Sequence, residues 1–121
     1  MKSGIFAAVA LLLVITLVSI NSVMLHNSIT EFIEDAEGLS VSDDGAYREA
    51  VRIKGRFEER ERFISLTVSH DDLTNIEECY AELVGYLQVD MQDEAEVTKS
   101  RLIDALLHLR RLSGINIDSI I

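Results

Sequence analysis

The sequence predicts an all-α protein with an N-terminal transmembrane helix, followed by a small antiparallel helical bundle (three to four helices) and a short apolar C-terminal tail. The run from Ile5 to Leu25 carries no charge, and at about 1.5 Å per residue it reaches about 31 Å, the thickness of bilayer hydrocarbon. Beyond it, apolar residues recur three and four positions apart and no proline interrupts them, which is typical of amphipathic helices. We therefore expect a membrane anchor over residues 1–25 and a helical domain over residues 26–121.

Two other interpretations of the apolar run can be weighed against an uncleaved signal-anchor. A cleaved secretory signal has a shorter apolar core and a small-residue cleavage site. Here the nearest candidates for such a site, Leu17-Val18-Ser19 and Ile20-Asn21-Ser22, both place a bulky residue where a small one is needed. A buried helix of a soluble domain is disfavoured because the run is apolar on all sides and the chain is too short to cover it. An uncleaved anchor is favoured.

The flanking charges predict the orientation of this anchor. Lys2 precedes the run, and the next basic residue in the chain is Arg48. The first charged residues after the run are acidic, beginning with Glu31. The positive-inside rule then places the N-terminus in the cytoplasm and residues 26–121 on the extracytoplasmic side of a single-pass plasma-membrane protein.

The charge balance limits the possible partners. The chain has 121 residues and a net charge of -10, and all 21 acidic residues lie beyond residue 30. An acidic domain argues against binding to nucleic acid and against docking on an anionic lipid surface, because both need an excess of Lys and Arg. Cys79 is the one cysteine, so it is either a small apolar residue in a helix interface, which is favoured, or a link between two copies.

Two helices are expected before residue 70. The anchor helix continues past Met24 and stops at Gly38, a natural C-terminal residue of helices. The second helix is expected over about Ala46–Val68, with a side chain from the preceding loop as its cap; the candidates for that cap are Ser42, Asp43 and Asp44. Its predicted inward stripe comprises Tyr47, Ala50, Val51, Lys54, Phe57, Glu61, Ile64 and Val68, with Phe63 on the flank.

Two further helices complete the predicted bundle. The third, over about Asp72–Val89, has the clearest seam, because its apolar residues alternate at spacings of three and four: Leu73, Ile76, Tyr80, Leu83 and Leu87. The fourth is expected over about Glu94–Leu112 and ends at Gly114, with an inward face of Leu102, Ala105, Leu106, Leu109 and Leu112. The apolar tail over residues 115–121 is expected to pack along the bundle.

The sequence offers one compact titratable cluster, which consists of His70, Asp71 and Asp72. These residue types can bind a metal ion or form an acid–base pair, but helix capping is the favoured interpretation. No glycine-rich phosphate loop, zinc-protease motif or nucleophile elbow occurs. We therefore predict no catalytic, cofactor-binding or metal-binding residue and no cofactor, with His70 as the one possible ligand or interaction position.

Several segments of the chain together resemble a known family. They are the helix start Asp44-Gly45-Ala46-Tyr47-Arg48-Glu49-Ala50, the spacing of Phe63 from His70, the run from His70 to Glu77, Leu106-Leu107-His108-Leu109 and the final stretch from Ile115 to Ile121. In these features the chain resembles the uncharacterised bacterial single-span membrane proteins of domain of unknown function family 4363. The family tends to have tryptophans where Tyr47, Phe57 and Phe63 stand here. The resemblance implies a helical domain anchored in a bacterial envelope and brings no catalytic residue with it.

These observations favour a non-enzymatic, membrane-anchored module for protein interaction or scaffolding at the bacterial cell envelope. Its expected partners are the lipid bilayer, through residues 5–25, and another envelope protein or a second copy of the chain. The alternative is a ligand- or metal-sensing envelope domain that uses His70, Asp71 and Asp72.

Overall fold

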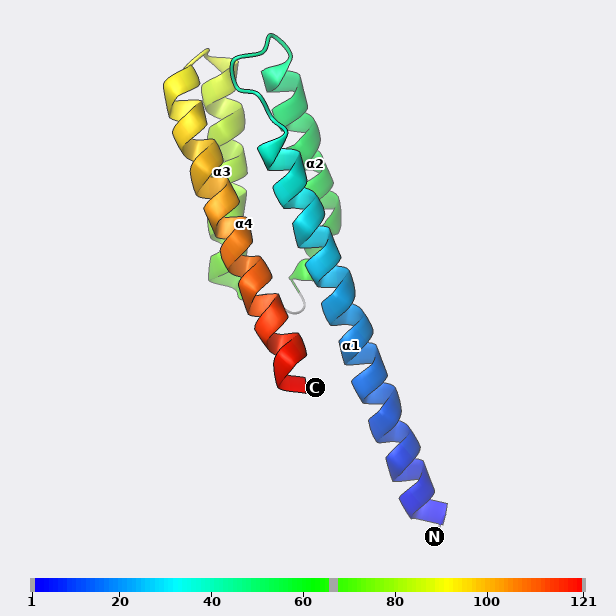
Figure 1. Cartoon of the computed structure of the whole chain (residues 1–121). Helices are drawn as coiled ribbons and strands as arrows, with labels where there is room; N and C mark the ends of the chain where they lie inside the picture. Colours follow the sequence, from blue (N-terminus) through cyan, green and yellow to red (C-terminus); the bar gives the residue numbers. More distant parts are fainter. Residues whose placement is uncertain (1, 66–67, 121) are drawn as a thin grey trace.

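The protein is built from four helices. The computed structural model describes residues 2–65 and 68–120, with side chains as far as Ser113. Along the chain the helices are α1 (Lys2–Glu37), α2 (Ala46–Ile64), α3 (His70–Gln88) and α4 (Gln92–Ile120). No strand occurs among the described residues, so the predicted all-α class is confirmed (Figure 1).

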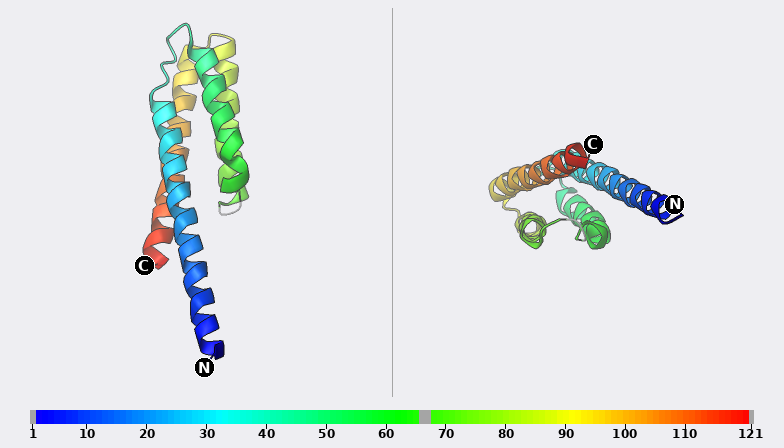
Figure 2. Two further views of the ribbon diagram at one scale, coloured as in Figure 1. Left: turned by 90° about the vertical axis from the view of Figure 1, so that its right-hand side faces the viewer. Right: turned by 90° about the horizontal axis from the view of Figure 1, so that it is seen from below.

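The helices run alternately up and down. α1 packs against α2 and α4, and α3 packs against the same two helices, which closes a four-helix bundle. Figure 2 shows α4 returning beside α1, and α1 continuing well beyond the ends of α2 and α3. Short connections between successive helices favour this antiparallel arrangement.

α1 passes through two environments without a break. Its first part is exposed and apolar, whereas its last part, from Ile29 onward, supplies the buried side chains of Ile29, Phe32, Ile33 and Ala36. The most apolar window of α1 has a mean hydropathy of 2.6, and none of it is buried. The helix is long and apolar enough to cross a bilayer, a property that it shares with signal sequences.

Aromatic rings from three helices form the centre of the core. The rings of Phe32 and Phe57 meet edge to face with centroids 5.3 Å apart, and Phe57 stacks on Tyr80 with centroids 5.0 Å apart. α4 covers them with buried leucines, which are Leu102, Leu106 and Leu109. All five predicted seam residues of α3 are buried, so the inward face predicted for that helix is confirmed.

The expectations for α2 were partly wrong. The helix ends at Ile64 rather than near Val68, and Leu66 and Thr67 lie outside the described residues. Its N-cap is Gly45 and no side chain caps it. Its buried face includes Ile53, which the predicted stripe omitted, while Tyr47 and Val51 are exposed. The stripe was misplaced because α2 has apolar residues on several sides, and contact with both α1 and α3 selects one of them.

The predicted end of α4 was also wrong. The helix begins at Gln92, passes through Gly114 and continues to Ile120, so the expected separate tail is part of the helix. A glycine inside a helix costs only about 1 kcal/mol relative to alanine, which a long packed helix tolerates. Leu112 is 39% exposed rather than inward, and the predicted packing of side chains 115–121 lies outside the described residues.

Candidate functional site

The His70 cluster lies at the start of α3, where it closes the N-terminus of the helix. Ser69 is the N-cap, and its hydroxyl accepts a hydrogen bond from the backbone N–H of Asp72 at 3.2 Å. The same hydroxyl donates to the Asp72 carboxylate at 2.8 Å. Asp72 therefore takes part in the cap, and Asp71 and Asp72 place negative charge at the positive end of the helix dipole.

The structure does not assemble a metal centre around His70. His70 is exposed at the first position of α3, whereas His26 belongs to α1 and His108 to α4. Across residues 2–65 and 68–120, no group of three or more His, Cys, Asp and Glu side chains is arranged to hold a metal ion. The role of His70 as a ligand or interaction position stays a prediction.

Cys79 lies inside the bundle. The residue is buried in the core on α3, and the thiol is free. Burial raises the pKa of the Cys79 thiol above its ordinary value, which disfavours the reactive thiolate. The geometry is that of a small apolar residue in a helix interface, the favoured interpretation of the sequence.

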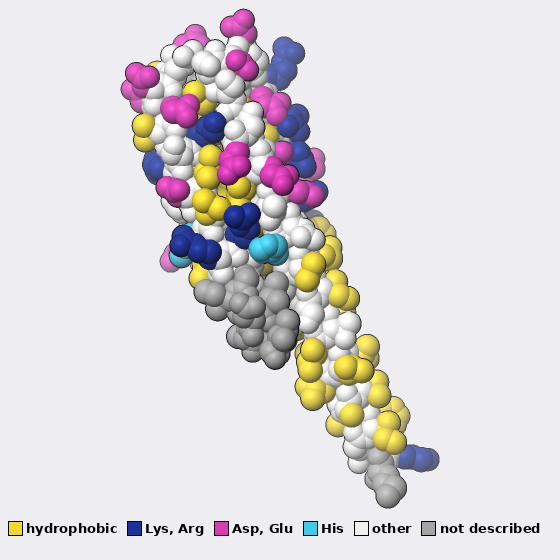
Figure 3. All heavy atoms as spheres, viewed as in Figure 1, with side chains coloured by type: hydrophobic (Ala, Val, Ile, Leu, Met, Phe, Trp, Pro, Cys, Tyr) yellow, Lys and Arg dark blue, Asp and Glu magenta, His cyan; other side chains and the backbone are white. Residues whose placement is uncertain are grey.

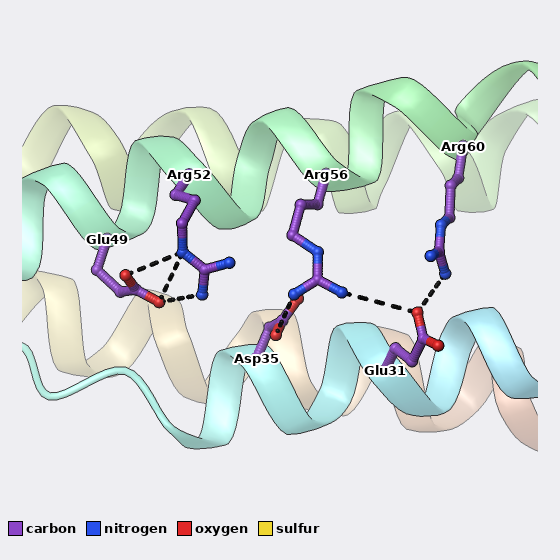
Figure 4. A network of polar contacts seen from close by, with 6 residues as sticks. All are labelled: Glu31, Asp35, Glu49, Arg52, Arg56 and Arg60. Carbon is purple, nitrogen blue, oxygen red and sulfur yellow. Dashed lines mark hydrogen bonds and ion pairs between the residues drawn. The ribbon is translucent and has the colours of Figure 1, made fainter.

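A set of ion pairs joins the packed half of α1 to α2. The Arg56 guanidinium donates to the Asp35 carboxylate at 3.0 Å and lies 3.8 Å from a Glu31 oxygen. Arg60 pairs with the same Glu31 carboxylate (Figure 4). The Arg60 guanidinium also lies 5.9 Å from the centroid of the Phe32 ring, within the range of a cation–π contact. The four charged residues thus link α1 and α2 at two successive levels along their contact.

Sequence analysis missed these ion pairs, although a signal for them exists. Glu31 and Asp35 are four residues apart on α1, and Arg56 and Arg60 are four residues apart on α2. Residues at this spacing lie one above another on a helix face. Two helices that carry opposite charges at the same spacing can pair along one line, and here the pairing is between antiparallel neighbours.

A cleft opens between α1 and the last turn of α2, below these ion pairs. It has a volume of about 460 Å³. Its walls combine apolar and polar side chains, namely Asn21, Met24, Leu25, Asn27, Ser28 and Glu31 from α1 and Arg60, Phe63 and Ile64 from α2. We call it the membrane-proximal cleft, because Asn21, Met24 and Leu25 belong to the last turns of the segment that the sequence predicts to cross a membrane. Phe63 at its edge is 70% exposed.

Comparison with protein-family models, with curated proteins and with solved structures gave no match. The resemblance to family 4363 therefore stays a prediction, and function has to be inferred from the residues of this chain.

Proposed function

We propose that this chain is a non-enzymatic, membrane-anchored interaction or scaffold module of the bacterial cell envelope. In this proposal residues 5–25 cross the plasma membrane with the N-terminus in the cytoplasm. The bundle then lies on the extracytoplasmic side and binds another envelope protein or a second copy of the chain.

The observation that carries the proposal is the continuity of α1. One helix runs from Lys2 to Glu37, so the exposed apolar segment and the buried core residues belong to the same rigid rod. The most apolar window of this helix is not buried and has the composition of a bilayer span. Such a helix would carry the bundle at a fixed height above the membrane, an arrangement that suits presentation of a surface to a partner.

The end of the bundle farthest from the apolar segment supplies a surface for such a partner. At the turn between α3 and α4, Val89 is 61% exposed and Val97 is 62% exposed, with Met91 between them. Exposed acidic residues surround these side chains; they are Asp90, Asp93 and Glu94. Figure 3 shows acidic side chains gathered at this end of the molecule. An apolar centre with a charged rim is typical of a protein interface, and the acidic rim favours a basic partner surface.

Site-directed photocrosslinking in intact cells tests the proposal. A photoreactive amino acid replaces Val97 in the full chain, and a matched variant carries it at Val51, which is exposed on α2. We expect a discrete crosslinked product from position 97, identified by mass spectrometry as a dimer or a second envelope protein, and a weaker or different pattern from position 51. Monomer alone from both positions, together with monomer alone from gently solubilised membranes, would contradict the proposal.

A further inference from the structure

The last turn of α2 lies at the same depth as the end of the apolar segment of α1. The membrane-proximal cleft is lined by Asn21, Met24 and Leu25 on one side and by Phe63 and Ile64 on the other. The predicted span ends at Leu25, so these α2 side chains are level with its final turn. Whatever medium surrounds that final turn also surrounds the end of α2.

Phe63 is unusually exposed for a large apolar side chain of the bundle. It is 70% exposed, whereas the other phenylalanines of the bundle, Phe32 and Phe57, are 1% exposed. It lines a cleft whose other apolar side chains are Ile64 beside it and Met24 and Leu25 at the end of the predicted span. Aromatic side chains are enriched where a protein crosses from hydrocarbon to headgroups.

The distribution of charge permits contact between this end of the bundle and lipid. Many acidic side chains lie at the opposite end, around the α3–α4 turn, and others lie along the body of the bundle (Figure 3). The end near the span carries charges of both signs on α2, α3 and α4: acidic Glu58, Glu59, Glu61, Asp71 and Asp72, and basic Arg60, Arg62, Arg110 and Arg111. In Figure 1 the ends of α2 and α3 lie level with the orange-to-red part of α4 that contains Arg110 and Arg111. The net charge of the whole chain is therefore not a measure of the charge at the end of the bundle near the span.

We infer that the end of α2 is a second membrane contact: Phe63 inserts into the boundary between headgroups and acyl chains, and lipid fills the membrane-proximal cleft. This inference rests on the proposed function, because it requires α1 to span the bilayer. It places the bundle directly against the membrane surface, held by the span and by Phe63, rather than on a free stalk. Because the inserted Phe63 side chain is uncharged, the contact does not depend on anionic lipid.

The absence of tryptophan from the chain allows a direct test with single reporters. Three full-length variants, Phe63→Trp, Leu12→Trp and Val89→Trp, are reconstituted into phosphatidylcholine vesicles with or without brominated acyl chains, which quench tryptophan on contact. All three positions are exposed, so the substitutions leave the core intact, and circular dichroism checks that they do. Leu12→Trp reports the span, and Val89→Trp reports the far end of the bundle.

We expect brominated lipid to quench Leu12→Trp and Phe63→Trp and to leave Val89→Trp unchanged. We also expect iodide in the water phase to quench Val89→Trp and to spare Phe63→Trp, whose emission lies to the blue of that from Val89→Trp. Quenching of Leu12→Trp with Phe63→Trp behaving like Val89→Trp would overturn the inference and leave the anchor standing. Failure of brominated lipid to quench Leu12→Trp would overturn the anchor and the inference together.

Discussion

The two halves of α1 differ in apolar content and in charge, and they face different surroundings. In the first half Leu11, Leu12 and Leu13 are each about 60% exposed, whereas in the second half Ile29 and Phe32 are at most 1% exposed. The second half alternates its apolar residues with acids, of which Glu31 and Asp35 pair with α2, whereas the polar side chains between Ile5 and Leu25 are all uncharged. Apolar content and charge together therefore separate a segment with the composition of a bilayer span from one that packs in the protein core.

The largest effect is expected from charges placed in the exposed half of α1. Leu12→Arg combined with Leu13→Arg should oppose membrane insertion by about 5–7 kcal/mol, since each arginine at the centre of a span costs about 2.5–3.5 kcal/mol. The measurement is the fraction of protein that stays in membranes after alkaline carbonate extraction. As a control, Val89→Arg with Val97→Arg on the exposed bundle surface should leave that fraction unchanged. Equal retention of both double variants would show that the apolar half is not a span.

The next largest effect is expected from the three aromatic rings in contact at the centre of the core, which are Phe32, Phe57 and Tyr80. Phe57→Ala should lower the free energy of unfolding by about 3–5 kcal/mol, because the ring fills the space between Phe32 and Tyr80. Phe63→Ala on the same helix is the matched control, and its effect should stay within about 0.5 kcal/mol because the side chain is exposed. Denaturant unfolding of the detergent-solubilised chain, followed by circular dichroism, compares the two. Similar losses for both variants would place the core elsewhere.

A smaller effect is expected from the ion pairs that position α2 on α1. Asp35→Asn should cost about 1–2 kcal/mol, because the Asp35 side chain is 14% exposed and its loss leaves Arg56 with the more distant Glu31. Glu49→Gln breaks a pair with Arg52 within α2 that is open to solvent and should cause no measurable change. The same unfolding experiment ranks the two variants. The reverse order would mean that the pairs between helices do not hold α2 in place.

The smallest effect at neutral pH is expected at Tyr80, whose hydroxyl is buried and has no hydrogen-bond partner among the described residues. Burial raises the pKa of Tyr80, and the nearby Asp35 carboxylate raises it further. The folded state therefore favours the neutral phenol of Tyr80. The stability that this preference supplies is fully present below the ordinary tyrosine pKa of about 10, and it is lost as the pH rises above that value because the unfolded chain then ionises. Tyr80→Phe should leave stability at pH 7 unchanged or slightly higher and should reduce the loss of stability above about pH 10.

Tyr47→Phe is the control for this pH dependence, because Tyr47 is 43% exposed on the outer face of α2. Melting temperatures measured from pH 7 to about pH 11 should follow the wild-type curve for Tyr47→Phe and depart from it for Tyr80→Phe. If both variants lose stability as steeply as the wild type, Tyr80 does not ionise during alkaline unfolding.

Sequence reasoning succeeded where one helix face was apolar and the other was not. The seam of α3, from Leu73 to Leu87, has a single apolar face, and all of its predicted residues are buried. On α2, Ile53 and Val51 are both apolar, yet Ile53 is buried and Val51 is 44% exposed. Periodicity could not choose between them, because the choice depends on where α1 and α3 lie in space.

The features near the span were harder to predict because they depend on pairs of helices. Gly114 is a residue type typical of helix ends but lies within α4, because one glycine inside a helix costs only about 1 kcal/mol relative to alanine. Predicting the membrane-proximal cleft requires knowing that Phe63 lies at the same depth as Met24. These two residues are far apart in the sequence, and nothing in the sequence indicates that they lie close together. The capping role of Ser69 and Asp72, by contrast, is local and was accessible from the sequence alone.

The most direct test of the central claim is the intact mass of the protein recovered from washed cell membranes, measured together with its partition between the membrane and soluble fractions. We predict a polypeptide that retains residues 5–25, resists carbonate extraction and is released by detergent. A mature chain that begins after Ser22, or protein found in the soluble fraction without detergent, would contradict the claim that the exposed half of α1 anchors the bundle.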